Sequence, residues 1–162
     1  MNINFNQVLL FAKGALTTIE LTLISMIIGT FLGLIIALGR ISKRKIIDKV
    51  TWVYVWIFRG TPLLLQIMIV YLAIPLLTKE IFGSAIIMSR FTSACIALVL
   101  NTAAYLAEIF RAGILSIDKG QFEASKALGM TSRQTMIHVI IPQTYRRVLP
   151  PYANELTMIL TD

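Results

Sequence analysis

The sequence predicts an all-α, polytopic membrane protein, and composition and hydropathy patterning carry that prediction. Of the 162 residues, 57% are hydrophobic and 14% are charged, against about 45–50% and about 25% in ordinary globular domains. The mean hydropathy is +0.79. The apolar runs do not alternate with the period of two that a membrane β-barrel needs. Helices are therefore expected, because a helix satisfies its own backbone hydrogen bonds in hydrocarbon.

Three uncharged runs are long enough to cross a membrane. They cover residues 21–39, 60–78 and 91–107, each near the roughly 17–25 residues that a helix needs to span about 30 Å. With their flanks they predict spans at about 16–39, 57–78 and 90–114. A further apolar segment, 146–162, predicts the start of a fourth span. Residues 1–162 are therefore expected to form one transmembrane domain that is incomplete at its carboxyl end.

The basic residues predict the topology. Lys and Arg number 15 against 8 Asp and Glu, which gives a net charge of +7. Apolar runs separate the basic residues, so no nucleic-acid partner is expected. Because basic loops stay in the cytoplasm, residues 40–59 and 116–147 are expected inside. The amino terminus and the 78–90 loop are expected outside a cytoplasmic membrane.

Several kinds of chemistry are not supported by the residues present. One cysteine and one histidine cannot build a disulfide framework or a zinc cage. No Gly-Lys pair occurs, and no two glycines stand two apart, so phosphate-loop and dinucleotide motifs are missing. We expect no catalytic residues, no metal and no cofactor in this chain, and no enzymatic activity.

The first predicted span carries a stripe of small residues. Ser25, Gly29, Gly33 and Ala37 recur every four positions, which lets another helix approach closely. Packing within the chain is favoured over a dedicated dimer face.

The second predicted span opens with a charge and a helix breaker, in the segment 58–63. Pro62 removes one backbone hydrogen bond and clashes with the carbonyl four residues earlier. Arg59 and Gln66 are seven apart and are expected to share a helix face. Two interpretations remain open. Either Arg59 reaches the cytoplasmic interface beside a packing kink, or a broken helix lines a translocation path.

The third predicted span has one polar face. Asn101, Tyr105 and Glu108 follow the helical period, and Arg111 stands three residues after Glu108. A carboxylate near hydrocarbon costs a few kcal/mol unless it is paired, and Arg111 is a suitable partner. The face predicts either a structural ion pair or the lining of a substrate path.

The segment 116–145 predicts two short helices outside the membrane. One covers about 121–128 and ends at Gly129, which suits a left-handed cap, and the other covers 132–141 and ends at Pro142. Two short helices joined by a tight turn form either a docking surface for a cytoplasmic partner or a loop packed on the membrane.

This segment resembles the EAA loop of ATP-binding-cassette importer permeases. The resemblance rests on Glu123-Ala124-Ser125, on Gly129 and on the Val139, Ile141, Pro142 ending, with mild replacements at three positions. Segments 22–40, 58–63 and 101–111 extend it to the polar amino acid permease family, from about Gly14 onward. Members of that family usually run further than this chain.

The resemblance implies a permease subunit that binds no nucleotide itself. Its implied partners are two ATPase subunits that bind ATP, a second permease subunit in a homodimer or heterodimer, an extracytoplasmic solute-binding protein and the lipid bilayer. The implied substrate is a polar amino acid, basic or neutral. The residues assigned to ATPase coupling are Gly120, Glu123, Ala124, Ser125, Gly129 and Pro142. The substrate-path candidates are Arg59, Gln66, Asn101, Tyr105, Glu108, Asn154 and Glu155. The alternative is a truncated membrane scaffold that docks an ATPase without transporting.

Overall fold

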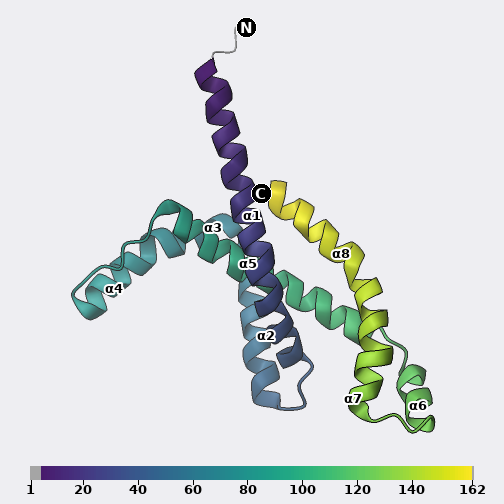
Figure 1. The fold of residues 1–162 in the computed structure, drawn as a ribbon. Coiled ribbons are helices and arrows are strands. Elements are labelled where there is room, and N and C mark those ends of the chain that lie inside the picture. The colour runs from purple at the N-terminus through teal and green to yellow at the C-terminus, as the bar shows by residue number, and fades with distance from the viewer. Residues whose placement is uncertain (1–4, 162) are drawn as a thin grey trace.

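The computed structural model describes residues 5–161, which form helices joined by short connections (Figure 1). The all-α prediction is confirmed. In chain order the helices are α1 (Phe5–Arg40), α2 (Lys45–Gly60), α3 (Leu63–Met68), the π-helical turn η1 (Ile69–Ala73), α4 (Ile74–Phe82), α5 (Arg90–Leu115), α6 (Lys119–Ala127), α7 (Ser132–Thr135), the π-helical turn η2 (Met136–Ile140) and α8 (Ile141–Thr161).

Three stretches of the described chain are long and apolar enough to cross a membrane: Phe5–Arg40, Leu63–Phe82 and Arg90–Leu115. The first helix begins at Phe5, well before residue 16, and runs without a break through Lys13 and Glu20. The second begins after residue 57, because Thr61 and Pro62 have extended backbones with ψ of 145° and 138°. Asp162, the last residue of the predicted fourth span, lies outside the described residues.

The small-residue stripe packs α1 against α5. A Cβ added to Gly29 would lie 2.8 Å from Thr102 Cγ2, and one added to Gly33 would lie 3.0 Å from the Ala103 carbonyl oxygen. Ser25 and Ala37, at the two ends of the stripe, are fully buried. The prediction that the stripe serves packing within the chain is confirmed. It brings the two helices so close that a side chain at either glycine would force the facing atoms of α5 to shift.

Helices α2 and α8 pack beside α5 as well. Ala37, Val55 and Ala107 form a small buried cluster between α1, α2 and α5. On α8, Val148 lies against Gly113 of α5, and a hydrogen bond of 2.9 Å between Thr30 and Tyr152 ties α8 to α1. Helix α5 is thus the central element (Figure 1). By contrast, α4 has no buried residue, and its apolar surface would face lipid or another subunit.

Both π-helical turns directly precede an Ile-Pro pair. Turn η1 is followed by Pro75 and turn η2 by Pro142. In η2 the bond runs from the Ile141 amide to the Met136 carbonyl, five residues back. A proline ring clashes with the carbonyl four residues earlier in an α-helix, and a wider π turn relieves that crowding. The prediction that a helix ends at Pro142 was therefore wrong, since helical structure runs without interruption from Ser132 to Thr161.

Candidate functional site

The break between α2 and α3 leaves a backbone carbonyl without its helical partner. In a continuous helix the Phe58 carbonyl would accept a hydrogen bond from the amide of residue 62, but Pro62 has no N–H. Two side chains replace it: Gln66 Nε2 donates to the Phe58 oxygen at 2.8 Å, and Asn101 Nδ2 donates to it at 3.2 Å. The sequence therefore breaks the helix and supplies the groups that satisfy the break.

Gln66 is the centre of this network. Its Nε2 also lies 3.1 Å from the Thr61 carbonyl oxygen and 2.9 Å from Thr61 Oγ1. Its Oε1 accepts a hydrogen bond of 3.1 Å from Asn101 Nδ2. Gln66 is 5% exposed. Its polar atoms are directed at the helix break and at α5.

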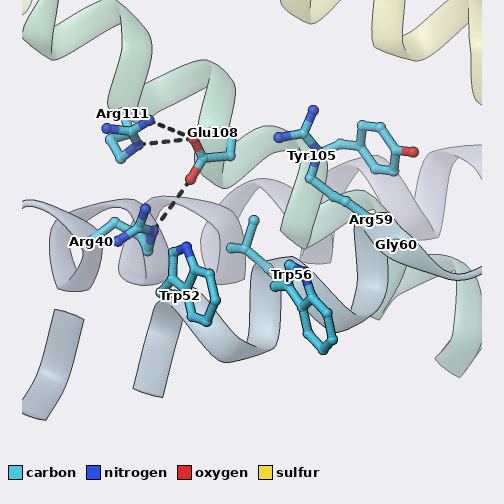
Figure 2. Close-up of a pocket in the computed structure, with 9 residues that line it drawn as sticks. Arg40, Trp52, Trp56, Arg59, Gly60, Tyr105, Glu108 and Arg111 are labelled. Atoms are coloured by element: carbon cyan, nitrogen blue, oxygen red, sulfur yellow. Dashed lines mark hydrogen bonds and ion pairs between the residues drawn. The ribbon is translucent and has the colours of Figure 1, made fainter. Parts of the chain in front are cut away.

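The prediction that Arg59 and Gln66 share one helix face was wrong. Two residues that are seven positions apart share a face only along an unbroken helix. Here the extended residues Thr61 and Pro62 separate the two positions. Arg59 instead lies over the ring of Tyr105, with 5.0 Å from its guanidinium carbon to the ring centroid (Figure 2). This geometry is that of a cation–π contact.

Glu108 is the hub of a charged cluster that joins three helices. Its Oε2 accepts from Arg111 Nη2 at 2.8 Å and Nε at 2.9 Å, and its Oε1 accepts from Arg40 Nε at 3.3 Å (Figure 2). Arg40 also pairs with Asp48 on α2. The predicted pair with Arg111 is confirmed. Sequence analysis missed Arg40 and Asp48, because no spacing pattern links positions so far from Glu108 along the chain.

Three open cavities meet around Tyr105. The first, about 490 Å³, lies between α2 and α5, and the second, about 530 Å³, lies between α5 and α8. Arg59, Tyr105 and Glu108 line both of them. Trp52 and Trp56, which stack at 6.2 Å, line the first (Figure 2). The third cavity, about 280 Å³, lies at the helix break and is lined by Thr61, Pro62, Leu63, Leu98, Asn101, Thr102, Tyr105, Glu155, Met158 and Ile159.

The structure thus brings most of the predicted path residues together. Asn101 and Glu155 line the third cavity beside Tyr105, and Glu155 is 7% exposed. Asn154 is placed differently: it is exposed on α8 with its Nδ2 3.8 Å from Met158 Sδ, and it lines none of these three cavities. Adjacent residues on a helix point about 100° apart, which is why Glu155 and Asn154 face different surroundings.

The loop after α5 folds as the capped helical unit that the sequence predicts. Asp118 caps α6 by accepting the Gly120 amide at 2.7 Å. Gly129 has φ of +75°, the left-handed conformation expected of it, and ends the turn after α6. Thr131 and Gln134 then form a capping box that starts α7. Each end of the loop is therefore specified locally.

The assigned coupling residues differ in exposure. Ser125 is buried, and its Oγ donates to the Gln121 carbonyl at 2.7 Å. Glu123, Ala124, Gly129 and Pro142 are exposed, and the neighbouring Leu128 is 82% exposed. The unit is tied to the long helices, because Gln143 Nε2 donates to Gln121 Oε1 at 3.0 Å and Arg147 donates to the Ser116 carbonyl. It stands at the end of α8 farthest from the carboxyl terminus (Figure 1).

Comparison with known proteins places this chain among transport components. The family model described as binding-protein-dependent transport system inner membrane component matches residues 29–162. The arginine transport system permease protein ArgU of Corynebacterium glutamicum is 46% identical over 92% of the chain and 49% of its own length. The arginine transport system permease protein ArtQ of Bacillus subtilis is 39% identical over 100% of the chain and 73% of its own length. The chain therefore spans about half to three quarters of the length of these relatives.

A solved structure shares the fold. The structure described as an amino acid ABC transporter with histidines superposes with a TM-score of 0.81 and 37% sequence identity, covering 99% of this chain and 74% of that one. The family is one of transport components rather than enzymes, and its members are multi-pass inner-membrane proteins. On the sequence match and this fold, the chain belongs to the binding-protein-dependent transport system inner membrane component family.

Proposed function

We propose that the chain is a membrane-spanning permease subunit of an ATP-binding-cassette importer for polar amino acids. Its amino terminus lies outside, and residues 40–59 and 116–147 lie on the cytoplasmic side, with the first of these segments entering the second span from residue 57. It works with a second permease subunit, two ATPase subunits that bind ATP, and an extracytoplasmic solute-binding protein. Arginine transport in two relatives supports a basic substrate, and Glu155 on the third cavity is a suitable group for a cationic side chain.

The observation that carries this proposal is the geometry of the α6–α7 unit. The left-handed Gly129 ends the turn after α6 and leaves Leu128 and the short side chain of Ala124 exposed. Small residues let another protein approach a helix backbone closely. The bond between Gln121 and Gln143 would transmit a push on α6 to the base of α8. Gly120, Glu123, Ser125 and Pro142 complete the assigned coupling residues.

The proposed substrate path runs through the cavities around Tyr105. Arg59, Glu108, Asn101 and Glu155 supply its polar lining. Gln66 stabilises the helix break beside the path, because its side chain donates a hydrogen bond to the Phe58 carbonyl. Asn154, exposed on α8, is a candidate for contact with a second subunit.

The proposal is tested in the assembled importer, reconstituted in liposomes with its ATPase and solute-binding protein. Stimulation of ATP hydrolysis by the loaded binding protein is the measurement. Gly129→Asp places a charged side chain at the docking face and in a left-handed backbone, so we expect loss of stimulation and weaker co-purification of the ATPase. Gly83→Asp is the matched control, because Gly83 also has a left-handed backbone, with φ of +73°, and belongs to the loop proposed to lie outside.

Equal activity of the two variants would contradict the coupling assignment. A wild-type complex that co-purifies with its ATPase but shows no stimulation would favour the scaffold alternative over a transporter.

A further inference from the structure

Arg59 is the arginine of the first cavity that has no acidic partner among residues 5–161. Both oxygens of Glu108 are occupied by Arg111 and Arg40, and Arg40 also holds Asp48. Arg59 instead makes its contact with the face of Tyr105. The first cavity thus presents three guanidinium groups and one carboxylate that is already bound (Figure 2).

Arg59 is exposed at the first cavity, so its charge is available to an anion. Arginine does not lose its proton in proteins, and a charged side chain in a membrane domain normally pairs with another group. The ring face of Tyr105 attracts the cation but occupies none of its five N–H donors. The C-terminal end of α2 favours a positive charge as well, yet Arg59 is directed along Tyr105 into the cavity and not back over the helix end (Figure 2).

The donors that remain fit an oxyanion, and the α-carboxylate is the oxyanion that every amino acid carries. A guanidinium presents a planar fork of N–H groups, which fits the two oxygens of a carboxylate. We propose that Arg59 binds the α-carboxylate of the transported amino acid. This assignment rests on the proposed function, and it narrows the substrate class to molecules with a free carboxylate. Arg59 lines the first two cavities with Tyr105, while Glu155 lines the third with the same Tyr105. Arg59 and Glu155 therefore lie on cavities that share the Tyr105 ring.

The helix break fixes where this group stands. Arg59 follows Phe58, whose carbonyl is held by Gln66 and Asn101. The position of the guanidinium over Tyr105 is thereby anchored to α5. Substrate binding would then need little rearrangement of the backbone at this point.

The test pairs a change in the protein with a change in the ligand. Equilibrium binding of L-arginine and of agmatine, its decarboxylated form, is measured on the assembled importer in nanodiscs without the solute-binding protein. L-glutamine and γ-aminobutyramide form a second pair. Arg59→Gln is expected to weaken binding of the two amino acids about 10-fold to 100-fold, as expected for a lost hydrogen bond to a charged group. Binding of the two amines should stay within about twofold, because they have no carboxylate to lose.

Two variants keep the result interpretable. Arg59→Lys retains the charge without the fork and should recover part of the affinity. Arg44→Gln removes an exposed arginine outside the cavities and should change nothing. Equal weakening of amino acids and amines by Arg59→Gln would overturn the carboxylate assignment alone. Absence of binding by every probe to a folded wild-type importer would overturn the amino acid path, and the assignment with it.

Discussion

The network that closes the helix break makes a quantitative prediction. Gln66→Leu keeps the side chain's size but removes the bonds to Phe58, Thr61 and Asn101. The Gln66 amide has two hydrogens, so its three donor contacts amount to two full bonds, and the bond accepted from Asn101 is a third. Hydrogen bonds between membrane helices contribute about 0.6 kcal/mol each. The variant should therefore lose about 2 kcal/mol of stability.

This loss is measured by thermal unfolding in detergent. For a chain of this size, about 2 kcal/mol corresponds to a fall of about 4–8 °C in the midpoint. Gln143→Leu is the control: it removes an exposed hydrogen bond to Gln121 and should change stability by less than about 0.5 kcal/mol. Equal midpoints for the two variants would show that Gln66 does not close the break, and the account of the α2–α3 junction would fail.

Two further predictions concern packing and charge. Gly33→Val forces a side chain against the backbone of α5 and should lower the free energy of unfolding by about 1–3 kcal/mol. Gly14→Val is the control in the same unfolding assay, and it should be nearly neutral because nothing lies within 4 Å of that site. Equal effects of the two variants would exclude close packing at Gly33. Glu108→Gln leaves its two arginine partners facing each other and should cost about 1–3 kcal/mol, between the values for exposed and buried pairs. The exposed Glu20→Gln serves as its control, and a Glu108→Gln midpoint no lower than that of Glu20→Gln would argue against the three-helix cluster.

Local chemistry explains what could be predicted from the sequence. The stripe at Gly29 and Gly33 and the left-handed turn at Gly129 depend on a few neighbouring residues, and both are confirmed. The Glu108–Arg111 pair depends on one turn of helix, and it is confirmed as well. Each of these features follows from a helical periodicity or a backbone preference, and both can be predicted from neighbouring residues in the sequence.

The features that could not be predicted depend on tertiary position. Arg40 meets Glu108 only because the glycine stripe brings α1 against α5. The helical path through Pro142 depends on a π turn, which the general rule that proline ends a helix does not anticipate. Sequence reasoning correctly located a break at Pro62 but continued the helical periodicity through it. For that reason the prediction that Arg59 and Gln66 share a face was wrong.

One missing N–H accounts for much of the geometry at the centre of the molecule. Because Pro62 cannot donate, the Phe58 carbonyl takes hydrogen bonds from Gln66 and Asn101. Those bonds fix the end of α2 against α5, and the end of α2 is where Arg59 stands over Tyr105. A continuous helix would satisfy the Phe58 carbonyl with a backbone amide, and neither side chain would be needed there. The proline therefore acts as a long-range constraint, because the hydrogen bond that it removes is replaced by contacts between two helices. Those contacts lie beside Arg59, the residue that we propose binds the substrate.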